Sequence, residues 1–582
     1  MNKTLNIILI TTVIFSFLSV FNAQSSNETV WFNGLARSYF ARDVIGNTAD
    51  TLYPNNSSNG YNLVDLNTHV NPIENIEIFA QLRVRNQFGS FFGSGTNIDV
   101  RQLRASGTIN NKFNFCIGDI FLKQNRFTLY NYDEELSSFE NDMFKSYRDI
   151  IHYENFYTDN RWRLQGLQTD FSLQFDRFIR SLEFDFFITR PRGSGQLSAN
   201  SYSPDLLLSG GSMVSRITKK LSFEANFVNF FEIPSSGNMN ISIKNPVYHS
   251  GLNYQYEINN VKLSHKLQTG FSERNWLFSN LDSGSDSLGF ITKGMFFEFE
   301  NEYFVKDSSF RLVLGARYVD PNFRSAGAQT RRIDFNNEYQ NTVYPFHTND
   351  YLARPSSVFD LLTDENRFNQ ELSGSLMNFN PIYSNILPFG DATPNRMGFY
   401  LTSNLNKNQI LISNIKTAYF NEVIGQGTSE KRNFLLLAGD VKININEILE
   451  KSKEFSISFS YWNELTTRNS DDVDNINLNS SHINSFLNFE VSKKFYLQLG
   501  LKQINASGNE FITQRSEYGV IQNFSLVNYN QSDFMYSTGI NYKINKNIYA
   551  NIQYNWWGED LNNSTFQDFN YRRLLFIFSV KL

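Results

Sequence analysis

The chain has 582 residues, a formal net charge of −5, one cysteine and a mean hydropathy of −0.38, yet it contains 56 Phe and 29 Tyr. The near-neutral charge argues against a nucleic-acid partner, and the lone Cys116 excludes an internal disulfide or a cysteine-based metal cage. Mean hydropathy alone would indicate a water-soluble protein, such as a Phe-rich sandwich. The strands of a membrane barrel, however, place only every second residue in lipid, and aromatic girdles are typical of them.

The N-terminus has the features of a secretory signal peptide. Lys3 supplies the positive charge, Leu5–Val20 form an apolar core, and we expect cleavage after Ala23. Residues 1–23 are therefore excluded from the fold, which leaves 24–582. An uncleaved anchor helix is the alternative, but the polar run QSSNET follows the apolar core closely. We expect no membrane-spanning helix elsewhere, because no other stretch offers about 18 consecutive apolar residues.

From about residue 28 to the C-terminus, apolar and polar side chains alternate in segment after segment. In one such segment Phe455, Ile457 and Phe459 alternate with serines. A period of two indicates strands with one apolar face, and segments of roughly ten to fifteen residues fit tilted transmembrane strands. Short and long links alternate between these segments, and residues 507–530 are predicted to be one of the long links. We therefore predict an all-β protein, a single transmembrane antiparallel β-barrel of about 22 strands (range about 18–24) with short periplasmic turns and long extracellular loops.

The last strand, Tyr571–Leu582, shows the clearest alternation. Its apolar face comprises Leu574, Phe576, Phe578, Val580 and Leu582. In a closed barrel such a strand pairs with the first strand and removes the free edge. These residues resemble the C-terminal signal strand of Gram-negative outer-membrane β-barrels, although those usually end on an aromatic residue. The Asn-, Phe- and Tyr-rich composition resembles that of porin-like barrels from the Bacteroidota.

The resemblance implies an outer-membrane location with both termini in the periplasm. It also implies contact with outer-membrane lipid and insertion by the barrel-assembly machinery. TonB-dependent transporters have barrels of similar strand number but need a folded N-terminal plug. The strand-like pattern here starts soon after the predicted cleavage site, so we expect no such plug domain.

Charged side chains on the polar faces of the strands are the candidate pore-lining residues. A charge that faces lipid at mid-depth costs about 2–4 kcal/mol, so we expect these charges to face the lumen or to lie near a rim. The candidates are Arg83, Arg85, Arg101, Arg161, Arg163, Glu298, Glu300, Glu302, Arg311 and Arg317. They either set solute selectivity or pair across neighbouring strands, as Glu300 with Arg311 would. Tyr496 and Trp557 are candidates for contacts with sugars, with an interfacial anchor as the alternative for Trp557.

Two links, 124–160 and 320–395, are unusually long. Within them the pattern predicts an amphipathic helix over Glu134–Tyr147 and a short helix over Ser356–Phe368. A barrel of about 22 strands has a lumen too wide for its own side chains to fill. We therefore expect both loops to fold inward as a constriction or cap, with outward surface decoration as the alternative.

The sequence predicts no catalytic, cofactor-binding or metal site. The six histidines show no metal-ligand spacing, and there is no GxSxG motif. His152, beside Asp149 and Glu154, is the nearest candidate for a hydrolase at the barrel rim, but a solvated loop histidine is the simpler interpretation. The acidic stretches Asp282–Asp286 and Asp471–Asp474 have carboxylates in short loops, yet neither has the full spacing of a calcium loop.

The leading hypothesis is a non-enzymatic outer-membrane channel for passive passage of small polar solutes, including oligosaccharides. The second is a structural or accessory barrel subunit of a secretion, surface-polysaccharide or barrel-insertion assembly, with envelope partners bound through the extracellular loops. A rim-located hydrolase is the third. The first two differ in whether residues 320–395 constrict the lumen, occlude it or reach outward.

Overall fold

The structure is a computed structural model in which strands predominate. It describes residues 29–47, 55–88, 95–132, 138–176, 178–193, 195–198, 201–203, 205–233, 240–279, 289–330, 342–345, 351–354, 372–376, 379–471, 473–515, 521–561 and 569–582. The predicted signal peptide, the helix predicted over Ser356–Phe368 and the acidic stretch Asp282–Asp286 lie outside these residues.

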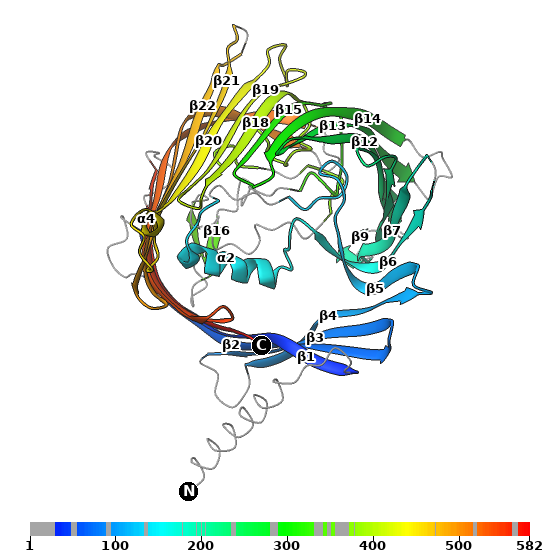
Figure 1. Cartoon of the computed structure of the whole chain (residues 1–582). Helices are drawn as coiled ribbons and strands as arrows, with labels where there is room; N and C mark the ends of the chain where they lie inside the picture. The colour runs from blue at the N-terminus through cyan, green and yellow to red at the C-terminus, as the bar shows by residue number, and fades with distance from the viewer. Residues whose placement is uncertain are drawn as a thin grey trace.

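One antiparallel sheet of 22 strands closes into a barrel, because β1 pairs with both β2 and β26 (Figure 1). The prediction of an all-β barrel with about 22 strands is confirmed. The barrel strands are β1 (Val30–Asn47), β2 (Asn55–Ile73), β3 (Ile76–Gln87), β4 (Thr96–Ile109), β5 (Phe113–Leu122), β6 (Trp162–Gln174), β7 (Ser181–Arg192), β10 (Asp205–Arg216), β11 (Leu221–Ile233), β12 (Asn240–Ile258), β13 (Val261–Ser279), β14 (Gly289–Val305), β15 (Phe310–Val319), β18 (Arg396–Lys407), β19 (Leu411–Asn421), β20 (Asn433–Asn444), β21 (Phe455–Arg468), β22 (Ile476–Ser492), β23 (Phe495–Arg515), β24 (Ile521–Asn545), β25 (Ile548–Leu561) and β26 (Phe569–Lys581).

In the part of the chain that the structure describes, four short strands and two helices lie outside the barrel wall. The strands form two small hairpins, and α4 is a single turn at the β20–β21 link. These elements are β8 (Gly195–Ser198), β9 (Ser201–Ser203), β16 (Thr342–Pro345), β17 (Tyr351–Arg354), α2 (Asp142–Glu154) and α4 (Ile445–Ile448).

The C-terminal strand β26 closes the barrel. Its register places Val580 opposite Ala36, and the Leu582 amide donates to the Gly34 carbonyl at 2.8 Å. The even-numbered residues of the C-terminal signal, from Leu574 to Val580, point outward, whereas Leu575 and Ile577 are buried on the inner face. Leu582 ends the chain on the outer side of the wall, 39% exposed. Pairing with β1 leaves neither terminal strand with a free edge.

The outer surface of the wall is an apolar band. Phe459 and Ile552 are 47% and 48% exposed, while their strand neighbours Ser460 and Gln553 are buried on the lumen side. A continuous apolar surface of this kind is costly in water and favourable in a bilayer. Among the described residues, no helix has the length and apolar character needed to cross a membrane.

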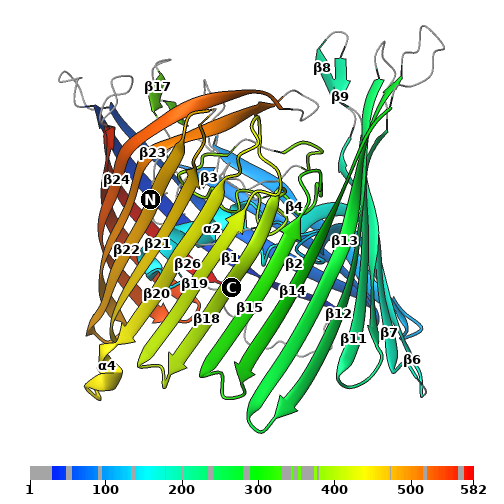
Figure 2. The same cartoon turned by 90° about the horizontal axis from the view of Figure 1, so that it is seen from above.

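Much of the described parts of both long loops lies inside the barrel, whereas β17 of the second loop lies beyond its mouth (Figure 2). Figure 1 shows α2 within the ring of strands. Phe127, from the first loop, stacks on Phe296 of β14 with ring centroids 4.0 Å apart. Phe323 and Ala392, from the second loop, belong to the same buried apolar cluster. Burial of these apolar side chains against the wall is what fixes the loops in the lumen.

Helix α2 begins eight residues later than predicted and continues to Glu154. Asn141 precedes the helix, and Asp142 places a negative charge in its first turn. Met143 and Phe144 pack against the inner faces of β23 and β24, where Gly500 and Gly539 leave room for them. A Cβ on Gly500 would lie 2.3 Å from the Phe144 ring, so this glycine is required for the docking of α2.

Strands β23 and β24 are longer than a bilayer requires, with 21 and 25 residues. Residues 507–530, predicted to be a long loop, mostly continue this hairpin, and that prediction is wrong. The ends of the two strands lean over the mouth of the barrel (Figure 2).

Candidate functional site in the barrel lumen

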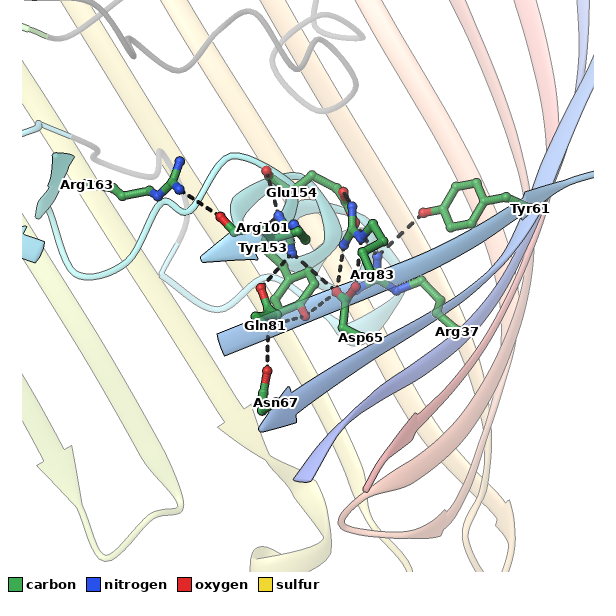
Figure 3. Close-up of polar contacts among 10 residues, drawn as sticks. All are labelled: Arg37, Tyr61, Asp65, Asn67, Gln81, Arg83, Arg101, Tyr153, Glu154 and Arg163. Carbon is green, nitrogen blue, oxygen red and sulfur yellow. Dashed lines mark hydrogen bonds and ion pairs between the residues drawn. The ribbon is translucent and has the colours of Figure 1, made fainter. Parts of the chain in front are cut away.

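The C-terminal end of α2 is held against β1–β3 by charged groups (Figure 3). The Glu154 carboxylate accepts hydrogen bonds from Arg37 at 3.0 Å and from both terminal nitrogens of Arg83. Arg83 also forms a two-pronged pair with Asp65, at 2.7 Å for each bond. The Tyr153 hydroxyl donates to the same carboxylate at 2.5 Å. Two carboxylates and two guanidinium groups therefore fasten the helix end to the wall.

Arg101 of β4 completes this contact. Its Nη2 donates to the backbone carbonyls of Tyr153 and Glu154 at 3.0 Å each. These carbonyls belong to the last turn of α2, which has no intrahelical partners for them and carries the negative end of the helix dipole. The guanidinium also lies over the rings of Tyr153 and Phe156, 4.8 and 4.2 Å from their centroids. Arg101 thus caps the helix and binds it to the wall.

A weak seam in the wall lies beside this contact, between β4 and β5. The two strands pair only from Arg104–Gly118 to Ile109–Phe113. Beyond that point the backbones of β4 and β5 are not paired, and hydrogen bonds from side chains connect this part of the wall. The Asp119 carboxylate accepts from the Leu103 amide at 2.7 Å, and Arg163 donates to the Arg101 carbonyl at 2.7 Å.

A second charged contact holds residues 123–132 against β14. Arg126 donates to Glu298 at 2.6 Å and to Glu300 at 2.8 Å. The Tyr400 hydroxyl donates to both carboxylates, at 3.0 and 2.8 Å. Burial alone would lower the pKa of Arg126, but the neighbouring carboxylates outweigh it and raise that pKa well above its usual value.

Asp391 adds the second long loop to the same contact. It pairs with Arg317 of β15 at 2.8 Å and with Arg126 at 3.3 Å. Arg317 in turn donates to Glu298 at 2.8 Å. Burial alone would raise the pKa of Asp391, but the two guanidinium groups hold it well below its usual range. Both loops and three wall strands, β14, β15 and β18, therefore meet in one network.

The start of α2 has a third charged contact. Glu140 pairs with Arg148 at 2.5 Å and with Lys502 of β23. All three side chains are less than 10% exposed. Sequence patterns alone did not identify Glu140, Arg126, Glu154 or Asp391, because loop residues carry no strand alternation that would indicate a lumen-facing position.

The structure brings eight of the ten predicted pore-lining residues into or beside these networks, leaving Arg85 and Arg161. Arg85 lies over the Tyr61 ring, 4.1 Å from its centroid. Arg161 precedes β6 rather than lying in it, and its side chain is 49% exposed, 3.9 Å from Asp159. The Glu300–Arg311 pair suggested by the sequence is wrong, because Arg311 donates to Glu302 at 2.5 Å. That these residues line a solute path stays a prediction.

The rim candidate at His152 does not have Glu154 at its disposal. Glu154, one of the two acidic neighbours of His152, is occupied by arginines, and His152 lies 5.3 Å from the Tyr157 ring between centroids. In the part of the chain that the structure describes, no group of three His, Cys, Asp or Glu side chains is arranged to hold a metal ion.

A closed antiparallel barrel with an apolar outer band and a charge-paired interior is a transmembrane barrel of the outer-membrane type. The chain is a multi-pass β-barrel of the Gram-negative outer membrane, in contact with its lipid.

No protein-family model matches the chain, and no curated protein matches it. Among solved structures it is similar to Acinetobacter baumannii OccAB4, with 10% identity over 96% of this chain and 100% of that chain and a TM-score of 0.32. It is similar to Pseudomonas aeruginosa OpdQ, with 9% identity over 95% and 98% of the two chains and a TM-score of 0.37. A BenF-like porin from Pseudomonas fluorescens Pf-5 shares 8% identity over 95% and 99%, with a TM-score of 0.31.

Proposed function

We propose that this barrel is a passive outer-membrane channel for small polar solutes, with a lumen narrowed by the loops 124–160 and 320–395. The observation that carries the proposal is that buried ion pairs fasten the described parts of both loops to the inner wall. A 22-stranded barrel has a wide lumen that something must narrow. Loops held in this way leave a polar passage instead of an empty cylinder.

A polar cavity supports this proposal. It has a volume of about 250 Å³ and lies beside Glu300 and Glu302, on the short-turn side of the Arg126 network. Lys266, Gln255 and Ser264 also line it. Charged and amide side chains around a space that water can enter are the lining that a small polar solute requires.

The structure lends no support to oligosaccharides as the solute. Trp557 is 2% exposed and stacks on Tyr571 with ring centroids 4.2 Å apart, and Tyr496 is also buried. Neither aromatic face is presented to the lumen for a sugar. We therefore propose small polar solutes and leave sugars as one outcome of a liposome-swelling assay with solutes of increasing size.

We also propose the orientation and biogenesis that are typical of outer-membrane barrels. The short turns and both termini lie in the periplasm, residues 1–23 are a cleaved signal peptide, and β26 is the strand that the barrel-assembly machinery engages. The chain acts as a channel and not as an enzyme. Protein partners, where present, contact the long loops at the opposite end.

A plugged accessory barrel is the second candidate. It is favoured by the apolar side of the loop packing, in which Phe127, Phe323 and Met143 are fully buried against the wall. A barrel plugged so firmly would conduct only after a partner displaces the loops. The two candidates therefore differ in the conductance of the isolated protein.

Single-channel recording of the full refolded chain in a planar bilayer tests both. A double variant, Glu140→Gln with Glu154→Gln, removes two of the charged anchors of α2 and keeps the loop at its full length. Glu183→Gln is the matched control, since its carboxylate lies in an exposed pair with Arg216. A channel is supported if the native chain gives conductance steps and these steps are larger in the double variant. Conduction by the double variant alone supports the plugged barrel, and silence from every protein contradicts the channel.

A further inference from the structure

Two buried arginines lie at the long-loop end of the lumen. Arg274 lies near the end of β13, and Arg324 lies just beyond β15. The Asn245 amide donates to the carbonyls of Glu273 and Arg324, at 2.9 and 3.2 Å, which holds the Arg324 segment beside β13. The Arg324 amide also donates to Ser272 Oγ at 2.8 Å, two residues before Arg274.

These positive charges act on one another. Burial lowers the pKa of Arg324 well below its usual value, and the charges of Arg274 and Arg515 lower it further. Like charges placed so close repel one another strongly in a site from which water is mostly excluded. An ordinary folded interior would supply carboxylates here, as it does for Arg317 and Arg573 elsewhere in this lumen.

Within the described residues, no carboxylate compensates Arg274 or Arg324. Arg274 is 8% exposed, and its Nε and Nη1 have no hydrogen-bond partner. Arg324 is 6% exposed, and its guanidinium donates to Gln329 Oε1 at 3.1 Å. The acidic residue next to Arg274, Glu273, pairs instead with Lys293 at 3.3 Å.

The Thr292 hydroxyl is a further buried group without a hydrogen-bond partner among the described residues. Thr292 of β14 stands directly opposite Arg274 in the strand register, and its buried Oγ1 has no partner in the described chain. A buried guanidinium without a partner is costly, and so is a buried hydroxyl without one. Buried groups of β13, β14 and the loop beyond β15 therefore have unused hydrogen-bonding capacity in this part of the lumen, and no described carboxylate pairs with the two guanidinium groups.

We propose that Arg274, Arg324 and Thr292 bind a small oxyanion, namely a carboxylate, sulfate or phosphate group of a soluble molecule. The planar guanidinium fork matches two oxygens of such a group, and charge-assisted bonds of this kind are short and strong. The site lies inside the barrel, so its ligand is a solute and not a membrane lipid. Binding here does not depend on conduction. In a conducting barrel the site would favour anionic solutes at the external entrance.

Isothermal titration calorimetry of the full refolded chain in detergent tests the proposal. Sulfate, inorganic phosphate and acetate are titrated separately at constant ionic strength. We expect saturable binding of at least one of them, weakened at least about tenfold in Arg274→Met and in Arg324→Met. Binding of acetate alone, of the inorganic anions alone or of all three supports the proposal and identifies the preferred chemistry.

The controls separate a built site from general charge. Arg216→Met removes an exposed arginine that is paired with Glu183 and should leave binding unchanged. Arg274→Lys keeps the charge but loses the fork and should bind with intermediate affinity, and Thr292→Val serves as a milder variant if Arg274→Met does not fold. Absence of saturable binding, or equal binding by the native chain and the folded Arg274 and Thr292 variants, would overturn the proposal. Neither result depends on whether the barrel conducts.

Discussion

Glu154, in the last turn of α2, is paired with Arg83 of β3, 71 residues away in sequence. The pair joins a loop helix to the barrel wall, and Arg37 shares the same carboxylate at 3.0 Å. The position of α2 in the lumen therefore depends on a contact that a single substitution can remove. Each of the charged contacts described above can likewise be removed by a single substitution. Variants can therefore test which contacts hold the loops in the lumen.

Glu154→Gln should loosen the C-terminal end of α2. The variant leaves Arg37 without its carboxylate, and Asp65 becomes the one carboxylate that Arg83 and Arg101 share. The lost charge-assisted bonds correspond to about 1–3 kcal/mol. We expect larger and noisier single-channel steps than in the native chain. Glu183→Gln should record like the native protein, and an unchanged noise spectrum for Glu154→Gln would show that the pair does not hold the helix.

Acid should weaken the other end of α2. Burial alone would raise the pKa of Glu140, but Arg148 and Lys502 outweigh it and hold the pKa below its usual value of 4.5. Because the folded pKa is the lower one, the pair stabilises the folded state fully above pH 4.5 and loses this contribution as the pH falls through the folded pKa.

The measurement is thermal unfolding of the native chain and of Glu140→Gln across this pH range. The native protein should unfold at the higher temperature at neutral pH, and the difference should shrink in acid. A difference that stays constant from pH 7 to about pH 3 would mean that Glu140 contributes no charge-dependent stability.

A buried ion pair joins the two strands that close the barrel. Arg573 of β26 stands opposite Asp43 of β1, with Nε–Oδ1 and Nη2–Oδ2 distances of 2.7 and 3.0 Å. Asp43→Asn leaves a buried guanidinium without its carboxylate, which costs about 3–5 kcal/mol. Urea unfolding of the barrel in lipid vesicles should show this loss. Lys306→Gln, in an exposed pair with Glu257, is the control and should unfold like the native chain.

Alternation of side chains was sufficient to predict the wall. Leu574 and Phe576 face outward as their spacing requires, and the strand count follows from many such segments. The ends of β23 and β24 were missed because they extend past the apolar band, where neither face needs to be apolar. Arg311 pairs with Glu302 and not with Glu300. In the strand register the acidic side chain diagonally across from Arg311 is Glu302, which lies two residues beyond Glu300 in β14.

The loop contacts could not be predicted from the sequence, for a different reason. A strand residue is placed by its neighbours, whereas Glu154 reaches Arg83 only after residues 123–161 have folded into the lumen. No periodicity encodes that step. Complementary charge is the one available signal, and many surface residues carry it as well.

The seam between β4 and β5 leads to the last prediction. Gly118, where the pairing ends, has a φ of +105°, and a Cβ there would lie 2.3 Å from the Leu103 carbonyl oxygen. Past this point Asp119 accepts from the Leu103 amide, which would otherwise face lipid without a partner. Asp119→Ala should therefore expose that amide at a cost of about 1–3 kcal/mol.

Hydrogen exchange of the barrel in nanodiscs measures this effect. The Leu103 amide should exchange faster in Asp119→Ala, and so should its neighbours on the unpaired side of β4. Amides between Arg104 and Ile109, which belong to the paired part of the strand, should keep their native rates. If both halves of β4 exchange alike in the variant, Asp119 supports the whole strand and not a local seam. If neither half changes, the backbone of β4 needs no side-chain partner at this place.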